Sequence, residues 1–343
     1  MEVFCLDVAQ GTCQIILLGD RRAIVIDCGS RSDRQALQFL TRMGIDSIER
    51  LIVSHSHVDH IGGAVGVLGA FQDQIERICF VQDDRFLNST FWLRISELYR
   101  TGRLRKNQLV RLEVSDSPQL VWSDDQRSVR LRTYSPTAAE NLLAQQTQQQ
   151  NPTSAVLFVE AGSHRIVFAA DSEVAQWREI YHRAGRRLSC DVLVVPHHAG
   201  RFHSSADDLE WMYSQALELG VAVISVGTTN QHGHPRADVV AAIARHGGRV
   251  MCTQITPRCN GNDTNLEFLR PAVLSPVLHP GSSSPEPDFT DAGRSRNVAC
   301  AGTVRVEMTA KNLTVSRLDD HQRAIDRLVA DNRLCPLCRP AVG

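Results

Sequence analysis

The stretch LIVSHSHVDHIGG, residues 51–63, decides the fold class of this chain. It opens with an apolar run of strand length, and three histidines and one aspartate follow within six residues. His55 and His57 stand two positions apart at the end of the predicted strand, so their side chains point to the same side and suit one metal ion. Asp59 and His60, on the turn that follows, can reach a second ion. A glycine pair then lets the backbone approach closely and start a helix.

Strand and helix patterns alternate on both sides of this stretch. Before residue 151 we expect strands at 3–8, 14–18, 23–26, 49–54 and 128–134, helices at 32–43 and from 63, and a glutamine-rich loop at 145–150. Residues 85–125 carry no readable pattern. After residue 151 we expect strands at 154–160, 165–170, 191–196, 221–226 and 249–253, and helices at 173–183, 207–219 and 237–245. Two blocks of mixed strands, each with its own helices, predict two sheets packed face to face with helices outside.

The composition changes after residue 259. Residues 260–299 form a predicted insertion loop, because the stretch 271–297 is rich in Pro, Ser, Gly and Asp. Residues 300–343 return to strand patterns at 303–308 and 313–316, followed by a helix at 319–330 and a cysteine-rich tail. We therefore predict one main domain over residues 1–259 that the final strands complete.

Charge and hydropathy narrow the functional classes. The chain has 343 residues, and 37 Lys and Arg balance 38 Asp and Glu, which excludes an overall basic coat for nucleic acid but not a local basic groove. No apolar run approaches the roughly 18 residues that a membrane span needs. The N-terminus enters a strand pattern directly, so we expect neither a signal peptide nor a membrane contact, and we predict a cytoplasmic location.

The ten cysteines fall into two sets. Five occupy apolar strand patterns and are predicted to be small buried side chains: Cys5, Cys13, Cys28, Cys79 and Cys190. In the tail, Cys335 and Cys338 form a Cys-x-x-Cys pair that needs two more ligands to hold zinc. We predict a structural zinc site made of Cys259, Cys300, Cys335 and Cys338. Replacement of Cys259 by Cys252, a redox pair, free surface thiols and a tail that binds a protein partner remain open.

The His-x-His-x-Asp-His segment resembles the signature of the metallo-β-lactamase superfamily. Four further segments, in the same order, resemble the soluble, nuclease-like hydrolase domain of the ComEC/Rec2 DNA-uptake family: LDVAQG at 6–11, DCG at 27–29, VPHH at 195–198, and the stretch from SVG at 225–227 to HGHP at 232–235. The resemblance covers most of residues 1–259 and the strand near 302–308. It implies an αββα sandwich of two mixed β-sheets flanked by helices, with residues 1–259 as the hydrolase domain.

The resemblance also implies roles for single residues. His55 and His57 would bind the first metal, Asp59 and His60 the second, and Asp171 would bridge the two. His197 would complete the second site. Imidazoles mixed with carboxylates suit Zn²⁺, or Mn²⁺ where more ligands are oxygens, so one or two such ions are expected.

One position departs from the superfamily pattern, because no histidine lies between His60 and His164 to act as the third ligand of the first metal. Asn151 stands in that region and is expected to give a weak oxygen ligand or to hold a water. Asp7 and Asp27 are expected to orient ligand histidines or to cap turns. Among the other histidines, His198 and His234 are candidates for contact with the phosphate or leaving group. Five are interpreted as surface residues: His164, His182, His246, His279 and His321.

The resemblance implies a metal-dependent hydrolase. We expect a phosphodiesterase or nuclease acting on DNA through a metal-activated water, with Asp59 orienting that water. The same ligands also serve hydrolases of lactones, thioesters, β-lactams and cyclic nucleotides, so a small-molecule substrate remains an alternative. A third alternative is a metal-stabilised interaction module that has lost most of its activity.

Overall fold

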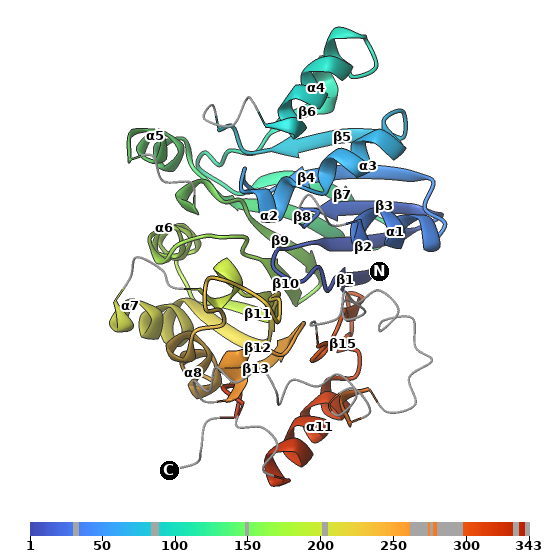
Figure 1. Cartoon of the computed structure of the whole chain (residues 1–343). Helices are drawn as coiled ribbons and strands as arrows, with labels where there is room; N and C mark the ends of the chain where they lie inside the picture. The colour runs from blue at the N-terminus through green and yellow to red at the C-terminus, as the bar shows by residue number, and fades with distance from the viewer. Residues whose placement is uncertain are drawn as a thin grey trace.

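The computed structural model describes residues 1–29, 34–83, 89–147, 151–200, 205–260, 274, 277–279, 298–331 and 336–339. Two β-sheets pack against each other, and helices cover the outer face of each (Figure 1). No helix in these ranges is both long and apolar enough to cross a membrane.

The first sheet has eight strands and is mixed. Across the sheet they run β15 (Leu313–Val315), β14 (Val304–Met308), β1 (Glu2–Cys5), β2 (Gln14–Gly19), β3 (Arg22–Ile26), β4 (Ser47–Val53), β5 (Ile75–Phe80) and β6 (Leu109–Arg111). Pairing is antiparallel from β15 to β3 and parallel from β3 to β6. The strand that opens the chain thus pairs with a strand near its end, with Val3 opposite Val306.

The second sheet has seven strands and is also mixed. Its strands run β13 (Arg249–Cys252), β12 (Leu217–Ile224), β11 (Leu188–Val194), β10 (His164–Phe168), β9 (Val156–Ala161), β8 (Val129–Ser135) and β7 (Gln119–Asp124). Pairing is parallel from β13 to β10 and antiparallel from β10 to β7.

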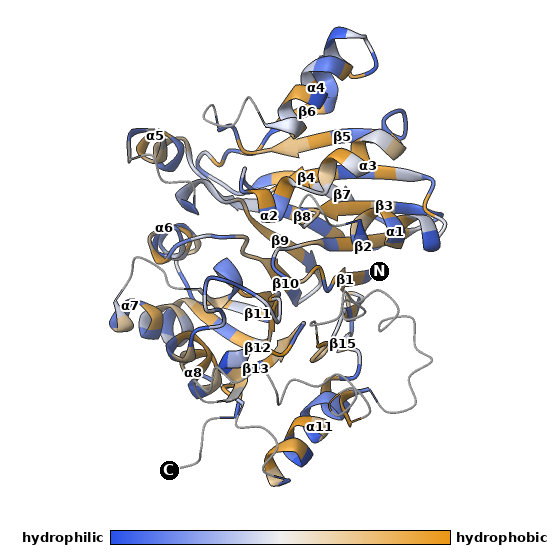
Figure 2. Ribbon diagram, in the orientation of Figure 1, coloured by the Kyte–Doolittle hydropathy of each residue, from blue (hydrophilic) through white to orange (hydrophobic). Residues whose placement is uncertain are grey.

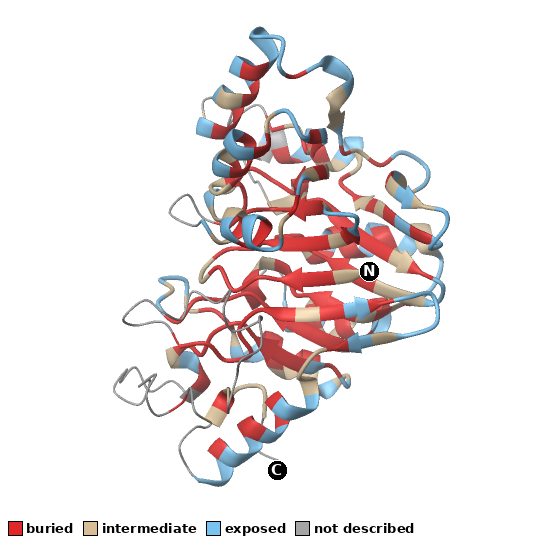
Figure 3. Cartoon of the chain, turned by 90° about the vertical axis from the view of Figure 1, so that its right-hand side faces the viewer, coloured by how far each residue is buried: buried red, intermediate tan, exposed pale blue. Residues whose placement is uncertain are grey.

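Alternating side chains on each strand divide the core into layers. On β3, Ile24 and Ile26 face the second sheet, whereas Ala23 and Val25 face the helices of the first. The helices on the first sheet are α1 (Gln35–Arg42), α2 (Val58–Ile61), α3 (Ala64–Phe71) and α4 (Thr90–Arg100). Beside the second sheet lie α5 (Ala138–Thr147), α6 (Val174–Ala184), α7 (Ala206–Trp211), α8 (Ala237–Arg245) and α11 (Leu318–Ala330). The strands are mostly apolar and the helices amphipathic (Figure 2), and the central strands are buried between the two layers of helices (Figure 3). The predicted αββα arrangement is confirmed.

Three local predictions differ from the structure. The helix expected at 207–219 ends in a π-helical turn, Met212–Ala216, and β12 begins at Leu217, because Leu217 and Leu219 are buried while Glu218 and Gly220 are exposed. The loop expected at 145–150 is helical as far as Thr147, where α5 ends. The unread stretch 85–125 contains α4, β6 and β7.

Candidate metal centre

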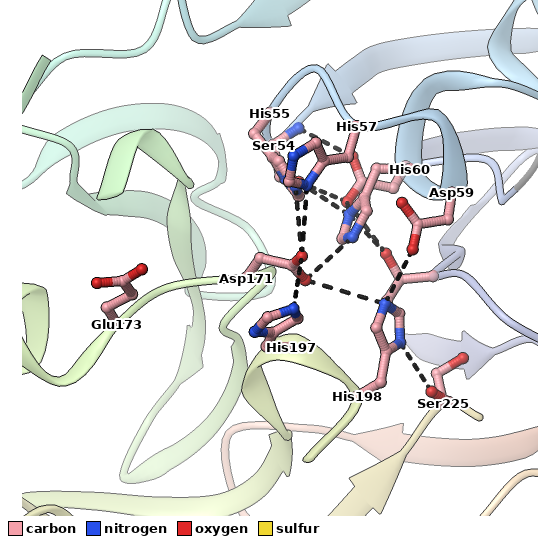
Figure 4. Close-up of polar contacts among 12 residues, drawn as sticks. Ser54, His55, His57, Asp59, His60, Asp171, Glu173, His197, His198 and Ser225 are labelled. Atoms are coloured by element: carbon pink, nitrogen blue, oxygen red, sulfur yellow. Dashed lines mark hydrogen bonds and ion pairs between the residues drawn. The ribbon is translucent and has the colours of Figure 1, made fainter. Parts of the chain in front are cut away.

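The predicted ligands meet where neighbouring parallel strands end. Residues 54–60 follow β4 in the first sheet, Asp171 follows β10, and His197 and His198 follow β11 in the second sheet. Because β10 and β11 are parallel neighbours, their carboxyl ends share one edge, and the packing of the two sheets brings the end of β4 to the same place. Figure 4 shows the rings of five histidines around Asp171: His55, His57, His60, His197 and His198.

The carboxylate of Asp171 lies at the centre of this cluster. Its Oδ2 is 3.5 Å from Nε2 of His55 and 3.7 Å from Nδ1 of His57. Its other oxygen, Oδ1, is 3.1 Å from Nε2 of His60 and 3.9 Å from Nε2 of His198. The two carboxylate oxygens therefore face two different sets of histidines, as a carboxylate that bridges two ions would.

Two groups of ligand atoms can be separated on distance. The first ligand group is His55, His57 and Asp171, and the second ligand group is Asp59, His60 and His198; within each, the ligand atoms all lie within 4.8 Å of one another. In the second group, Oδ2 of Asp59 is 3.4 Å from Nε2 of His198. Asp59 and His57 are about a quarter to a third exposed, with side chains at 27% and 34%, so the site opens to solvent on their side.

Hydrogen-bond acceptors at Nδ1 of His60 and of His198 orient these two rings of the second ligand group. Nδ1 of His60 lies 2.8 Å from Oδ2 of Asp27, which also accepts hydrogen bonds from the hydroxyls of Ser54 (2.6 Å) and Thr12 (3.2 Å). Nδ1 of His198 lies 2.8 Å from the carbonyl oxygen of Ser225. With the proton held at Nδ1, each ring presents the lone pair of Nε2 to the site, which is the tautomer that metal binding requires.

The sequence pattern missed Ser54, Thr12 and Ser225 as supports of this kind. Ser225 belongs to the SVG segment at 225–227, and Ser54 immediately precedes His55. The position of Ser54, a hydroxyl residue directly before the His-x-His-x-Asp-His segment, was a sequence signal that could have indicated its supporting role.

Charge and burial shift the pKa values across the site. Burial raises the pKa of Asp171, but the histidines around it, His60 and His55 first, outweigh burial and hold it well below its usual range. Burial lowers the pKa of His60, but the carboxylates of Asp171 and Asp27 raise it by more, so that it lies well above the ordinary value. Burial, together with the charge of His60, lowers the pKa of His55 to about 4. The site therefore holds ionised carboxylates against imidazoles at close range.

Several buried polar atoms at the centre make no hydrogen bond of suitable geometry among the described residues, although Nε2 of His60 and Oδ1 of Asp171 lie 3.1 Å apart. They include Nε2 of His60 and Nε2 of His198, both in the second ligand group, and Oδ1 of Asp171, which faces that group. Orphaned buried acceptors are costly unless something else satisfies them. A divalent cation does so, and nitrogen and carboxylate donors of this kind suit zinc or manganese. The residues present thus fit the metal ions that the sequence predicted.

The two adjacent histidines lie beside different ligand groups. The sequence prediction put His197 at the second metal and His198 outside the ligand set. In the structure His198 belongs to the second ligand group, whereas Nε2 of His197 lies 3.9 Å from Oδ2 of Asp171, on the side of the first group. Which of the two residues binds a metal stays a prediction. Residues 197–199 all have positive φ, and this left-handed turn sends the neighbouring rings to opposite oxygens of Asp171.

The other predicted site residues lie around this centre. Asn151 opens a short 3₁₀ turn, Asn151–Thr153, and Ala155 then donates its backbone N–H to the carbonyl of Ser54 (2.9 Å). Residues 151–155 therefore run beside the segment that carries His55. A weak ligand role for Asn151 stays a prediction.

Asp7 and His234 have surroundings of different kinds. Oδ1 of Asp7 accepts hydrogen bonds from the Gln254 side chain (2.8 Å) and the Ala9 backbone (3.2 Å), which agrees with the turn-capping alternative.

The ring of His234 stacks on that of His198 with 6.0 Å between centroids. Burial, with His198 and His197 nearby, lowers the pKa of His234 to about 3, so this ring is uncharged at neutral pH.

Gly11 and Gly227 allow the segments 6–11 and 225–227 to pack closely beside the site. Gly11 has φ near +144°, and a Cβ there would lie 2.6 Å from the carbonyl oxygen of Asp59. A Cβ on Gly227 would lie 2.7 Å from the backbone nitrogen of Gln10. The segments at 6–11 and 225–227 thus pack against each other and against the ligand loop, and only glycine fits at these contacts.

Comparison with known proteins agrees with this geometry. Residues 7–78 match the family model described as the metallo-beta-lactamase superfamily. ComE operon protein 3 of Bacillus subtilis (strain 168) is 23% identical over 270 residues, which is 74% of this chain and 32% of that protein. Recombination protein 2 of Haemophilus influenzae (strain Rd) is 26% identical over 267 residues, 76% of this chain and 29% of that protein. The chain thus spans about a third of the length of the curated relatives it matches.

Among solved structures, the metallo-beta-lactamase fold protein YhfI from Bacillus subtilis aligns with a TM-score of 0.44 at 14% identity, covering 74% of this chain and 96% of that one. The family match and the two mixed sheets flanked by helices confirm the predicted fold. The matches to ComE operon protein 3 and Recombination protein 2 confirm the resemblance to the ComEC/Rec2 family.

Proposed function

We propose that this chain, a metallo-β-lactamase-fold hydrolase domain related to the ComEC/Rec2 proteins, is a two-metal phosphodiesterase that cleaves DNA. The observation that carries the proposal is the position of Asp171, whose two oxygens face two separate groups of histidines. Paired divalent ions held in this way suit in-line displacement at phosphorus, where both the attacking and the leaving oxygen need stabilisation.

The ligand roles follow from the two groups. His55 and His57 would hold the first ion, Asp59, His60 and His198 the second, and Asp171 both. When bound, the ions would supply Lewis-acid activation of water and of a phosphoryl oxygen. The chain's own residues orient the ligands and exclude water. Asp27 and Ser225 fix the rings of His60 and His198, and the buried core beneath Asp171 closes the inner side of the site.

Asp59 is the group best placed to orient the attacking water. Its side chain is partly exposed, and it lies beside Nε2 of His198. Burial raises its pKa, but His198 and His60 lower it by more, so that Asp59 stays ionised at neutral pH. An ionised carboxylate accepts a hydrogen bond from the water and thereby aims a lone pair at phosphorus.

His234 is proposed to contact the phosphate. Because its pKa is lowered to about 3, the uncharged ring donates an N–H to a phosphate oxygen and is a poor source of a proton for the leaving group. Its neighbours Gly233 and Pro235 line a pocket of about 310 Å³ together with Arg236 and Arg258. Arg258, and Arg236, which pairs with Asp238 at 3.2 Å, would supply guanidinium groups to the backbone phosphates of a nucleic acid.

DNA is proposed as the substrate because the relatives are a protein named for recombination and a ComE operon protein, and because a pocket lined by two arginines and one aspartate lies beside His234. Zinc or manganese as the catalytic metal and a cytoplasmic location also belong to this proposal.

The test is a substrate panel with the purified 343-residue chain and added Zn²⁺, Mn²⁺ or Mg²⁺. It compares labelled single-stranded DNA, double-stranded DNA and RNA with a generic phosphodiester, a lactone, a thioester and a chromogenic β-lactam. We expect DNA cleavage that His60→Ala abolishes and that His182→Ala, an exposed histidine on α6, leaves intact. Faster turnover of a lactone, thioester or β-lactam than of DNA would replace the proposed substrate class, and metal binding without any turnover would favour an inactive interaction module.

A further inference from the structure

The side chain of Gln176 lies between two segments that approach the metal centre. Gln176 is in the first turn of α6 and is only 1% exposed. Its Nε2 donates hydrogen bonds to the carbonyl oxygen of Ser154 at 3.0 Å and to the hydroxyl of Ser135 at 2.5 Å. Its Oε1 accepts the backbone N–H of Glu173 at 3.0 Å. One buried amide therefore uses both of its polar ends to join the segments around residues 135, 154 and 173.

The hydrogen-bond partners fix which way this amide points. The backbone N–H of Glu173 can only donate, and the carbonyl oxygen of Ser154 can only accept. Rotation of the amide by half a turn would place Oε1 against the carbonyl oxygen and the NH₂ group against the N–H. Both contacts would become repulsive, and the buried carbonyl of Ser154 would lose its donor, which is costly. The observed orientation is the one that satisfies all three partners.

On one side Gln176 holds the loop that carries Asp171. Glu173 follows Asp171 by two residues, and its own side chain lies apart from the histidine rings (Figure 4), so the contact with Gln176 acts on its backbone. The N–H of Ser172 closes the same loop by donating to the carbonyl of Ala169 at 3.1 Å. The indole of Trp177, the next residue of α6, donates to the hydroxyl of Ser172 at 3.1 Å. Two successive side chains of α6 thus hold the two residues that follow Asp171.

On the other side Gln176 holds a segment that runs beside the ligand loop, residues 54–60. The N–H of Ser154 donates to the carbonyl of Asn151, and the N–H of Ala155 donates to the carbonyl of Ser54, both at 2.9 Å. The carbonyl of Ser154 lies between these two contacts in sequence and accepts its hydrogen bond from the amide on α6. The segment 151–155 is therefore held by the ligand loop at one point and by α6 at another.

The first ligand group depends on this link more than the second does. In the second group, Asp27 and Ser225 hold two rings directly, each at 2.8 Å. In the first group, Nδ1 of His55 faces the hydroxyl of Ser54 at 3.2 Å, and the carbonyl of Ser54 is held by Ala155. A shift of the segment 151–155 away from α6 therefore moves the first ligand group relative to the central carboxylate and leaves the supports of the second group in place.

We propose that Gln176 is a positioning residue, which sets the separation between Asp171 and the first ligand group and thereby the affinity of the first metal ion. The proposal rests on the two-metal centre of the proposed function. Gln176 acts through the backbones of Glu173 and Ser154 rather than as a ligand itself. Removing a support behind a ligand typically weakens metal binding by roughly 10- to 100-fold, although the ligand atoms remain.

The test measures metal affinity in two backgrounds of the 343-residue chain, by competition with a chromogenic chelator. His60→Ala disables the second ligand group, so the ion that remains reports on the first group, and His55→Ala does the reverse. We expect Gln176→Leu to weaken binding roughly tenfold in the His60→Ala background and less than about twofold in the His55→Ala background. Equal losses in the two backgrounds, or no loss in either, overturn the proposal.

Gln176→Glu separates positioning from the capping of a helix. Gln176 and Glu173 form a capping box at the start of α6, and a glutamate in this place still accepts the N–H of Glu173. An ionised glutamate offers no N–H to Ser154, however. We therefore expect Gln176→Glu to keep the fold and to lose as much affinity for the first ion as Gln176→Leu. Full metal affinity in Gln176→Glu would leave Gln176 the role of a cap and overturn the proposal.

Gln322→Leu is the matched control. Gln322 lies in α11, is 9% exposed, and donates from Nε2 to the carbonyl of Val250 at 3.2 Å, away from the metal centre. It should lower the midpoint of chemical denaturation and leave the affinity for both ions unchanged. A loss of metal affinity equal to that of Gln176→Leu would reflect general instability and overturn the proposal. Because DNA is absent from these measurements, a chain that binds both ions but cleaves another substrate overturns only the proposed substrate class.

Discussion

Nδ1 of His60 lies 2.8 Å from Oδ2 of Asp27, and both side chains are buried beneath the metal centre. Through this contact a carboxylate that is not itself a proposed ligand sets which ring nitrogen of His60 faces Asp171. The same carboxylate receives the backbone N–H of Ser54 at 2.8 Å, which fixes the start of the ligand loop. Asp27 therefore controls the site through orientation.

Asp27→Asn should weaken metal binding by roughly 10- to 100-fold while leaving the ligand atoms in place. The amide lacks the charge that keeps the proton on Nδ1 of His60. Competition with a chromogenic chelator measures the effect. Asp191→Asn is the matched control, because Asp191 also pairs with a histidine, His164, at 3.3 Å but lies away from the site. Equal losses from both variants would contradict an orienting role for Asp27.

Asp171→Ala should remove both ions, because each ligand group depends on one oxygen of this carboxylate. We expect bound catalytic metal and hydrolysis to decrease together, by roughly 100-fold or more. Dialysis against a chelator should reproduce the loss in wild-type protein, and added Mn²⁺ or Zn²⁺ should restore it there but not in the variant. Retention of one tightly bound ion by Asp171→Ala would show that the two groups do not share this residue.

His197→Ala and His198→Ala should give different results although the residues are adjacent. Nε2 of His198 lies 3.4 Å from Asp59, so its loss should empty the second ligand group. His197 lies on the side of His55 and His57, and its removal should weaken only the first group. Metal equivalents and affinities measured in parallel distinguish the two. The opposite pattern would restore the assignment that the sequence alone suggested.

Gly11→Ala should reduce both stability and turnover. A methyl group there would meet the carbonyl of Asp59 at 2.6 Å, and the positive φ adds strain. We expect the free energy of unfolding to decrease by about 1–3 kcal/mol and Asp59 to shift. Gly69→Ala, in α3 with nothing within 4 Å of the added carbon, should instead stabilise the fold by up to about 1 kcal/mol. Chemical denaturation and turnover measured on both variants provide the comparison.

The sequence predicted the sandwich because strand and helix periods alternate clearly around the stretch 51–63. It also named the residues that meet at the centre, since each follows the carboxyl end of a strand. It gave no indication that the rings of His197 and His198 face opposite oxygens of Asp171, because three successive residues with positive φ turn the backbone in a way that neither the helix period nor the strand period describes.

The neighbourhood of Cys252 and Cys300 could not be predicted from the sequence for a related reason. Cys252 and Cys300 become neighbours through hydrogen bonds between segments separated by the insertion, and such long-range pairing has no local signal. His321, predicted as a surface residue, appeared isolated in sequence for the same reason, but α11 buries it against Cys300 and it is only 2% exposed. The zinc site of Cys259, Cys300, Cys335 and Cys338 stays a prediction, because Cys335 lies outside the described residues.

The pairing of β1 with β14 has a consequence for how the chain reaches its native state. β1 is held on one side by β2, which follows immediately, and on the other by a strand about 300 residues later. During synthesis the outer edge of β1 must therefore wait, with its backbone groups unpaired, until nearly the whole chain has left the ribosome. Such late closure slows folding and leaves an edge that invites intermolecular pairing. Shortened versions that stop before residue 300 should aggregate even though they contain every proposed ligand of the hydrolytic site.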